Sequence, residues 1–558
     1  MSYIDAFNDR NGSVIKVVER NSVGIRQIKE YPISYTFYYG DPKGKHRSIY
    51  GDPLTRFTTR KKSEFEKEKR IHSNKKIFES DIKPEFRCLS DNYMGQDSPK
   101  LHTCFFDIEV DWDAKRGFAP PSDPFNKITS ITFYNDWSDQ LITMAIPPKT
   151  LSYHEAEEIA STFENTFVFE KEADMLEAMF SVFEDADILT GWNSEGFDVP
   201  YLVNRVTRVL SKDDTRKFCL FNQFPKPRKY NNFGKEETTY DLIGRVHMDY
   251  LQLYKKFNYE NRQSYKLDNI GELEVGERKT EYEGTLDQLY NNDFHKFIEY
   301  NRQDVMLLYK IHAKLKYLDL ASQMAHENTV TLPTVMGSVA IIEHAIYNES
   351  HERGLIVPDR QKIFEYEVDE DEEDIEDKAA GAYVAHPKKG IHKYVGAVDL
   401  SSLYPSTIRS LNIAPETMIG QVRLDRTDEY IANEMKKNGG KFAQAWEGIF
   451  CTFEYQSIMN REIGTLLTID FNDGRVEQYS AAEIYDMIFD SNRPWDISAN
   501  ATIFTYEKEG VIPGLLTRWY SERKVLQKKA KSISDLEKGI DIPEDMMNEL
   551  SELMGEKI

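Results

Sequence analysis

The segment that most constrains the fold is residues 102–110, with the sequence HTCFFDIEV. Apolar residues lead up to Asp107 and Glu109, which are two positions apart. Side chains at i and i+2 of a strand point to the same face, so a strand here would place both carboxylates together at the end of a buried β-run. Two carboxylates about 4 Å apart repel by roughly 4 kcal/mol at an effective dielectric constant near 20. A hard cation, Mg²⁺ or Mn²⁺, would offset this repulsion. Taken alone, however, a D-x-E pair indicates a solvated strand end more often than a metal site, and the later segments are needed to favour the metal site.

Two later segments each contribute a further acid. Residues 188–205 (ILTGWNSEGFDVPYLVNR) predict an apolar strand, a Gly-Trp-Asn turn and a helix that begins at Asp198. That carboxylate could instead cap the helix by accepting backbone N–H bonds. Residues 295–311 (HKFIEYNRQDVMLLYKI) predict an amphipathic helix with Tyr300 and Asp304 on one face, at i and i+4. An Asp beside such an apolar stripe is costly unless it is paired or bound to a metal.

The composition indicates a folded, multidomain protein. The 558 residues are too many for one core and suggest roughly three or four domains. The net charge of −23 argues against a nucleic-acid-binding surface over the whole protein but leaves room for a local basic groove. The cysteines form no C-x-x-C pair, and the sequence has neither a signal-peptide pattern nor an apolar run of the roughly 18–20 residues that a membrane span needs. We therefore expect reduced thiols in a soluble, intracellular protein.

The chain up to about residue 315 has a β-rich first segment and then a segment in which strands and helices alternate. Short β-like runs at 13–18 and 33–39 precede a mixed-charge segment through Lys76, which we expect to form a solvated helix. From residue 102 to about 315, strands alternate with helices, which is typical of α/β organisation. Besides 102–110, the expected elements here are strands at 127–133 and 186–192 and helices at 153–163 and 171–183.

The second part starts after an acidic run, residues 365–377, which we expect to be an exposed linker. Residues 394–398 predict a strand that leads to Asp399. Residues 418–500 predict an irregular insertion of mixed structure, and residues 511–531 a helix that is basic towards its end.

The order D-x-E, N-x(4)-D and Y-x-x-x-D, spread over about 200 residues, resembles the DEDDy family of 3′→5′ exonucleases. The resemblance implies an RNase H-like domain in which four acids hold two metal ions for phosphodiester hydrolysis. By motif, Asp107, Glu109 and Asp304 would hold the metal that activates the water. Asp198 would help with the second metal, and Tyr300 would orient the nucleophile.

Residues 397–406, AVDLSSLYPS, resemble motif A of family B DNA polymerases. The alternative is that Asp399 caps a turn and Tyr404 packs in a core. The resemblance implies that Asp399 is one of two catalytic aspartates that bind a Mg²⁺ pair, with the Leu400 carbonyl as a further ligand. It also implies that the N–H groups of Ser402 and Leu403 bind the triphosphate and that Tyr404 stacks under the incoming sugar.

Residues 518–531, RWYSERKVLQKKAK, resemble the first fingers helix of that family, in which two cations reach the triphosphate. Arg523 matches the first cation. The position of the second falls at Gln527, beside Lys528, so the sequence departs from the family pattern there. The alternative is a solvated basic helix.

Several strings make the resemblance specific to the polymerases of T-even-type tailed bacteriophages: FDIEV, LTGWN-x-x-x-FD-x-P, YKKF, QSYKLD, LYPS-x-IR and N-I-x-P-E-T. It implies a hairpin at 228–240 that helps strand separation. It also implies that Gly381-Ala382-Tyr383 touches the template, although the leading Tyr of the family segment is missing. The cell compartment implied is the cytoplasm of an infected bacterium.

Two motifs of the family do not occur in these residues: the Lys-x-x-x-Asn-Ser-x-Tyr-Gly helix and the Asp-Thr-Asp turn with the second catalytic aspartate. We therefore expect a split polymerase completed by a second, C-terminal subunit, rather than a truncated chain. The acidic helical tail 533–558 could belong to that interface. Two other hypotheses are a free-standing 3′→5′ exonuclease with a vestigial palm and a non-catalytic subunit that binds primer-template or RNA.

The expected fold is multidomain, α/β and α+β. The expected domains are a β-rich N-terminal domain (1–101), the exonuclease domain (102–316), a return to the N-terminal domain with the acidic linker (317–378), the first part of the palm (379–505) and the start of the fingers (506–558). The expected cofactors are two Mg²⁺ or Mn²⁺ ions at the exonuclease site and two at the completed polymerase site. The expected partners are primer-template DNA with its single-stranded 3′ end, dNTPs, the completing subunit and, through it, a sliding clamp.

Overall fold

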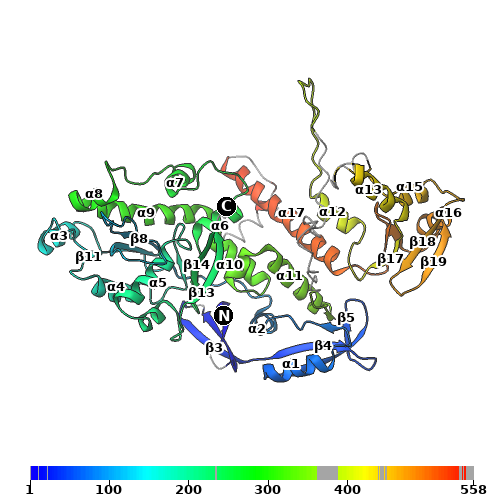
Figure 1. Ribbon diagram of the computed structural model, residues 1–558, viewed down its shortest axis with the longest axis horizontal. Coiled ribbons are helices and arrows are strands. Elements are labelled where there is room, and N and C mark those ends of the chain that lie inside the picture. Colours follow the sequence, from blue (N-terminus) through cyan, green and yellow to red (C-terminus); the bar gives the residue numbers. More distant parts are fainter. Residues whose placement is uncertain are drawn as a thin grey trace. The chain divides into compact units, whose positions relative to one another are not determined.

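The computed structural model describes residues 2–9, 12–21, 23–232, 235–360, 387–437, 439, 445, 449–538, 543 and 546–547. The chain divides into two compact units, residues 1–40 with 55–348 and residues 41–54 with 349–558. Figure 1 shows the elements coloured along the sequence. The predicted linker at 365–377 and the segment Gly381-Ala382-Tyr383 lie outside the described residues.

The first unit starts with β-structure, as the sequence predicts. Its first elements are β1 (Ser2–Asn8), β2 (Val14–Arg20), β3 (Arg26–Pro32), β4 (Tyr35–Gly40), α1 (Lys62–Ile71), β7 (Ile77–Phe78) and α2 (Pro84–Tyr93). β1, β2 and β3 form an antiparallel sheet in that order. The mixed-charge segment forms α1, in which only Phe65 is buried, so the predicted solvated helix is confirmed.

The centre of the first unit is a mixed six-stranded sheet. Its strands, in order across the sheet, are β11 (Thr166–Val168), β10 (Gln140–Ala145), β9 (Ile128–Asn135), β8 (Thr103–Val110), β12 (Ile188–Thr190) and β15 (Val246–His247). β8 pairs antiparallel with β9 and parallel with β12. The strands predicted at 102–110, 127–133 and 186–192 are confirmed, and the architecture is mixed α/β.

Helices and one hairpin surround this sheet. They are α3 (Tyr153–Ala160), α4 (Glu172–Val182), α5 (Asp198–Val209), η1 (Asp213–Phe218), the hairpin β13 (Lys226–Asn232) and β14 (Lys235–Asp241), α6 (Tyr250–Phe257), α7 (Leu267–Val275), α8 (Leu286–Asn292), α9 (Phe294–Leu315), α10 (Tyr317–Glu327), η2 (Leu332–Met336) and α11 (Ser338–Glu352). A capping box starts α3: the Glu155 N–H donates to Ser152 Oγ at 3.3 Å, and the Ser152 N–H donates to the Glu155 carboxylate at 2.8 Å. The hairpin predicted at 228–240 is confirmed as β13 and β14.

Alternate side chains of β8 enter two different cores. Cys104, Phe106 and Ile108 pack in the core that includes residues of α4 and α5. Phe105 packs in the core that includes residues of α6 and α9. Figure 1 shows α4 and α9 on opposite sides of β8. Because Asp107 and Glu109 share the parity of Phe105, they point to the side of α9.

The second unit has its own antiparallel sheet. In order across the sheet, the strands are β19 (Val476–Ser480), β18 (Leu466–Phe471), β17 (Met418–Val422), β21 (Thr502–Thr505) and β20 (Trp495–Ile497). The other elements with residues in this unit are β5 (His46–Ser48), β6 (Pro53–Thr59), β16 (Leu355–Ile356), α12 (Leu403–Ser410), α13 (Asp425–Lys437), α15 (Phe453–Met459), α16 (Ala481–Tyr485), the π-helical turn η3 (Asp486–Asp490) and α17 (Val511–Glu537). Leu467, Ile469 and Phe471 alternate into a buried core, so the region predicted as irregular is an ordered sheet. The helix predicted at 511–531 is confirmed as α17.

The strand predicted at 394–398 does not form. Residues 387–402 contain no strand, and Tyr394, Val395 and Val398 are exposed. A strand needs a neighbouring backbone for its ladder of hydrogen bonds, and the described part of the chain offers this segment no partner strand. The apolar, β-branched composition of the segment favours a strand, but composition without a partner does not produce one.

The cysteines behave as expected. All four are free, and Cys88, Cys104 and Cys219 are buried. Within the described ranges, no helix combines the length and the apolar character that crossing a membrane requires.

Candidate metal centre

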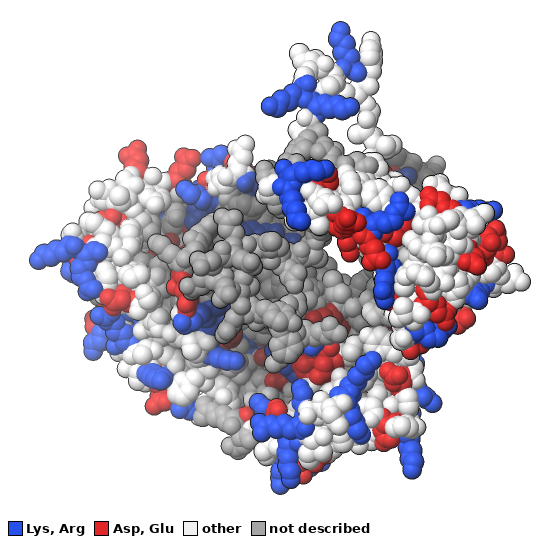
Figure 2. All heavy atoms as spheres, turned by 45° about the vertical axis from the view of Figure 1, so that its right-hand side comes forward, with Lys and Arg blue, Asp and Glu red and all other residues white. Residues whose placement is uncertain are grey.

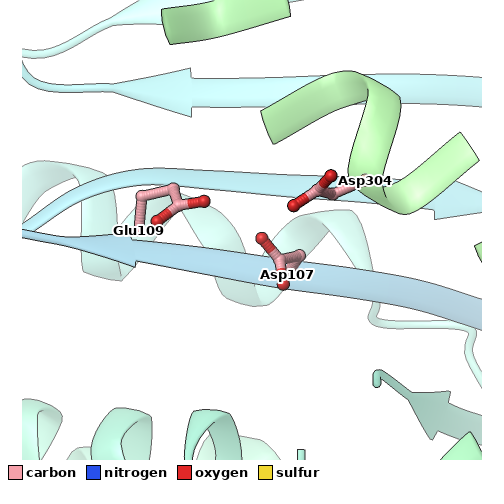
Figure 3. Close-up of side chains that lie close together, drawn as sticks. All are labelled: Asp107, Glu109 and Asp304. Carbon is pink, nitrogen blue, oxygen red and sulfur yellow. The ribbon is translucent and has the colours of Figure 1, made fainter. Parts of the chain in front are cut away.

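Three of the predicted acids meet between β8 and α9. Asp107 and Glu109 come from β8 and Asp304 from α9, and one carboxylate oxygen of each lies within 4.8 Å of the others. Figure 3 shows the three carboxylates close together, with Asp107 and Asp304 turned toward each other. Oxygen ligands bind Mg²⁺ or Ca²⁺ at about 2.0–2.6 Å, so ligands on opposite sides of one ion are about 4–5 Å apart. The cluster has the dimensions of a site for a single cation.

Helical periodicity brings α9 into this site. The Asp293 side chain caps the helix by accepting from the Lys296 N–H at 3.0 Å. Val305 and Leu308, three residues apart and therefore on one face of α9, are both buried. Asp304 is 2% exposed and Tyr300, one turn earlier, 9% exposed. The sequence prediction that these two residues share a face is confirmed.

Burial and mutual repulsion hold protons on these acids. Burial, followed by the negative charges of Asp304 and Asp198, raises the pKa of Glu109 to about 8. Burial and the charge of Glu109 raise the pKa of Asp107 well above its ordinary value, and burial raises the pKa of Asp304. Carboxylates bind metals in their ionised form. A divalent cation would therefore lower all three pKa values.

One oxygen of the cluster lacks any partner. Asp304 Oδ1 is buried and accepts no hydrogen bond from the described residues. A buried acceptor left unsatisfied costs about 1–3 kcal/mol. A cation between the carboxylates would satisfy this oxygen, and Mg²⁺ and Mn²⁺ are hard ions that take such ligands. The donor set therefore fits a divalent metal.

Lys279 is a site residue that the sequence reasoning missed. Its Nζ contacts Asp304 Oδ2 and donates to the Tyr300 hydroxyl at 3.2 Å. Burial opposes its charge, but the charges of Asp304, Tyr300 and Asp107 hold its pKa above the ordinary value. Lys279 lies between α7 and α8, outside any periodic pattern, so the sequence carries no signal for it. It compensates part of the negative charge of the cluster.

Asp198 lies beside the cluster rather than within it. It begins α5 and is 5% exposed, and its Oδ1 accepts from the N–H of Ile108 in β8 at 3.2 Å. The N-cap of α5 is Phe197, so the alternative of a simple helix cap is wrong. Burial raises the pKa of Asp198 to about 7. Its hydrogen bond ties the start of α5 to the strand that carries Asp107 and Glu109.

Asp249, which the sequence reasoning also missed, braces the loop before α5. Its carboxylate accepts from three backbone N–H groups, those of Asn193, Glu195 and Leu251, at 2.9–3.1 Å. Its negative charge is one cause of the raised pKa of Asp198. An isolated Asp that caps a short helix gives no such signal in the sequence.

The residues of the predicted polymerase site belong to the second unit. Asp399 lies in an exposed segment without regular structure, and Leu400, Leu403 and Tyr404 are exposed. Ser402 precedes α12 with φ 54°, in the left-handed region, and its side chain makes no capping bond. The alternative that Tyr404 packs in a core is wrong.

Arg523 lies on the exposed part of α17. Among the described residues, the side chains of Arg523 and Asp399 make no hydrogen bond or ion pair. α17 packs on α12, where the Arg409 guanidinium donates to Thr517 Oγ1 at 3.2 Å and lies 4.5 Å from the Tyr520 ring centre. On the face drawn in Figure 2, the Lys and Arg side chains of the described residues are interspersed with those of Asp and Glu.

Family models match both parts of the chain. Residues 53–270 match the model for the exonuclease domain of DNA polymerase family B, and residues 333–542 match the model for DNA polymerase family B. The first match contains Asp107, Glu109 and Asp198, and the second contains Asp399 and Arg523. The two matches agree on one family, the first through its exonuclease domain and the second through its polymerase region. The chain belongs to the family B DNA polymerases.

Individual relatives agree with this assignment. The chain is 27% identical over 434 residues to a DNA-directed DNA polymerase of Escherichia phage RB69, which is 73% of this chain and 46% of the relative. It is 30% identical over 297 residues to that of Enterobacteria phage T4, 53% of this chain and 32% of the relative. It is 26% identical over 271 residues to the DNA polymerase delta catalytic subunit of Bos taurus, 45% of this chain and 23% of the relative. The chain spans less than half the length of these relatives.

Proposed function

We propose that this chain removes nucleotides from the 3′ end of DNA as the proofreading part of a replicative polymerase. The observation that carries the proposal is the cluster of the half-buried Asp107 and Glu109 with the buried Asp304, whose Oδ1 is unsatisfied. The match of residues 53–270 to the exonuclease-domain model supports it. In this proposal residues 102–316 are an RNase H-like exonuclease domain.

Each residue of the cluster has a role that its position supports. Asp107, Glu109 and Asp304 would hold one divalent ion, Mg²⁺ or Mn²⁺, and Asp198 would contribute to a second. Bound ions supply positive charge that stabilises the oxygens of an in-line phosphodiester displacement. Tyr300 would orient the attacking water through its hydroxyl, which Lys279 fixes at 3.2 Å.

The same reaction implies that the partner is primer-template DNA with a single-stranded 3′ end. A primer end that is to be hydrolysed must reach the cluster as a single strand, and proteins bind single strands by stacking bases on aromatic rings and by contacting phosphates with cations. The hairpin of β13 and β14 would help to separate the strands. We propose that the reaction takes place in the cytoplasm of an infected bacterium, and the similarity to two phage polymerases supports this.

The second unit would supply half of a nucleotidyl-transfer site. Asp399 and the Leu400 carbonyl would bind metal, Ser402, Leu403 and Arg523 would bind the triphosphate of a dNTP, and Tyr404 would stack under its sugar. In this proposal residues 379–505 belong to the palm and 506–558 to the fingers.

Two-metal transfer needs a second palm carboxylate besides Asp399. We propose that a further polypeptide segment supplies it, together with the rest of the palm, fingers and thumb and any contact with a sliding clamp. The exposed apolar side chains of Tyr394, Val395 and Val398 support a partner that pairs with this segment.

A primer-template with a 5′ label, Mg²⁺ and four dNTPs tests both halves of the proposal. We expect shortening from the 3′ end without extension. Asp107→Ala should abolish the shortening, and Glu157→Gln, an exposed acid on α3, should leave it unchanged. Absence of Mg²⁺-dependent shortening would contradict the exonuclease role, and extension by these residues alone would contradict the incomplete polymerase site.

A further inference from the structure

The buried side-chain amide of Asn301 contacts Asp107 of the cluster. Asn301 follows Tyr300 on α9 and is completely buried. Its Nδ2 donates to Asp107 Oδ2 at 2.8 Å. Its Oδ1 accepts from Ser130 Oγ at 2.8 Å and from Thr132 Oγ1 at 2.6 Å, two hydroxyls of β9. The side chain therefore connects a metal-binding carboxylate to the neighbouring strand.

A chain of hydrogen bonds extends further from Thr132. Thr132 Oγ1 lies 3.0 Å from Thr143 Oγ1 on β10. Thr143 Oγ1 accepts from the Arg302 guanidinium at 3.2 Å. Arg302 also donates to the Glu164 carbonyl and to Thr166 Oγ1, at 3.1 and 3.0 Å, which holds the guanidinium in place.

Both ends of this chain fix the direction of its hydrogens. A guanidinium can only donate, so Thr143 accepts from Arg302 and has its own hydrogen free for Thr132. Thr132 then gives its hydrogen to Asn301 Oδ1. Once a bound cation has ionised Asp107, its carboxylate can only accept, so the amide group of Asn301 must turn its NH₂ to Asp107. The orientation of the amide is determined from both sides.

The consequence for Asp107 is chemical as well as geometric. One oxygen, Oδ2, is held by a neutral donor, which leaves Oδ1 for a cation. A hydrogen bond from a neutral donor favours the ionised carboxylate without bringing a competing positive charge. Partners of this kind behind metal ligands change metal affinity about 10- to 100-fold when they are lost.

We infer that Asn301 is the positioning residue of Asp107 and that Thr132, Thr143 and Arg302 fix its amide for metal binding. The inference rests on the proposed metal site of the exonuclease. Asn301 would act on the cation only through Asp107. Thr132, Thr143 and Arg302 would act only through the amide of Asn301, and none of these residues would touch the cation or the substrate.

Mn²⁺ affinity, measured by electron paramagnetic resonance on the whole chain, tests the inference without any activity assay. Asn301→Leu removes the donor at similar volume and should weaken Mn²⁺ binding about 10- to 100-fold. Thr132→Val should give a smaller loss, and Thr132→Ser, which keeps the hydroxyl, should restore wild-type affinity. Thr132→Val should add nothing in the Asn301→Leu background, because the two residues act through one amide.

Asn135→Leu is the matched control. Asn135 is a buried amide on the same strand as Thr132, and its Nδ2 donates to the Val182 carbonyl at 2.8 Å. Its substitution should lower the melting temperature and leave Mn²⁺ affinity unchanged.

Two outcomes separate the failure of this inference from the failure of the proposed function. If wild type binds Mn²⁺ and Asp304→Asn abolishes the binding, while Asn301→Leu and Thr132→Val bind as wild type, the positioning role is wrong and the metal site stands. If wild type and Asp304→Asn bind Mn²⁺ equally, the metal site itself is wrong. Should Asn301→Leu fail to fold, the Thr132→Val and Thr132→Ser pair decides.

Discussion

Replacing Glu109 by Gln should stabilise the metal-free protein at alkaline pH. In the fold, burial and the nearby acids raise the pKa of Glu109 from 4.5 to about 8, so the folded protein holds this proton more tightly than the unfolded chain does. The stability that Glu109 contributes is complete below pH 4.5 and is lost as the pH rises to about 8. Gln is uncharged and does not incur this loss.

The size of the effect follows from the pKa. Each pH unit between the two values costs about 1.4 kcal/mol, which gives on the order of 5 kcal/mol for Glu109. Glu109 keeps part of its surface exposed, and water there reduces the cost, so we expect about 2 kcal/mol. The first unit comprises residues 1–40 and 55–348, and with an unfolding entropy of about 2.1 cal/mol/K per residue a change of about 2 kcal/mol corresponds to a rise of roughly 3 °C in melting temperature.

Differential scanning fluorimetry at pH 8.5 in EDTA measures this directly, with Glu157→Gln as an exposed control. Mg²⁺ should stabilise wild type, by about 2.7 kcal/mol at a hundredfold excess over its dissociation constant. It should stabilise Glu109→Gln much less. Equal melting temperatures of wild type and Glu109→Gln in EDTA, with equal gains from Mg²⁺, would refute the reasoning.

Three further predictions concern other parts of the molecule. Lys279→Met should slow single-turnover 3′→5′ hydrolysis about 10- to 100-fold at unchanged DNA affinity, because the Tyr300 hydroxyl loses its donor. Asp399→Asn should leave the exonuclease rate unchanged, because Asp399 is exposed and belongs to the other unit. Arg205→Met should lower the free energy of unfolding by about 3 kcal/mol in urea titrations, because it leaves the largely buried carboxylate of Glu172, 2.6 Å from the guanidinium in the fold, without its cation.

Each of these has an outcome that contradicts it. A Lys279→Met protein with the wild-type hydrolysis rate would show that the ammonium is only a surface cation. A slower exonuclease in Asp399→Asn would mean that the two units are coupled. For Arg205→Met, an unchanged urea midpoint would mean that Glu172 finds another partner.

Periodicity explains why the acids of the cluster could be predicted from the sequence. Asp107 and Glu109 share a face because a strand alternates with period two, and Tyr300 and Asp304 share a face because a helix repeats every 3.6 residues. Both patterns depend only on neighbouring residues, so they can be recognised in the sequence. That the strand and the helix bring their acids together at one site could be predicted only from the resemblance to a family.

The remaining site residues could not be predicted, for physical reasons. Lys279 lies on a loop, and nothing in its neighbourhood indicates which acid it approaches. Asn301 appears in the sequence as one polar residue beside Tyr300, and its role depends on hydroxyls of two other strands. The strand predicted at 394–398 fails for the opposite reason, since a strand depends on a partner that local composition does not specify.

The most direct test of the metal cluster replaces a non-bridging oxygen of the 3′-terminal phosphodiester by sulfur. Mg²⁺ binds sulfur poorly and Mn²⁺ tolerates it better. If Asp107, Glu109 and Asp304 hold an ion that contacts this phosphate, one sulfur diastereomer should resist hydrolysis in Mg²⁺ and be hydrolysed in Mn²⁺. The Asp304→Asn variant should hydrolyse the substrate in neither metal. Equal hydrolysis of the sulfur and oxygen substrates in both metals, or hydrolysis that persists in EDTA, would contradict the account.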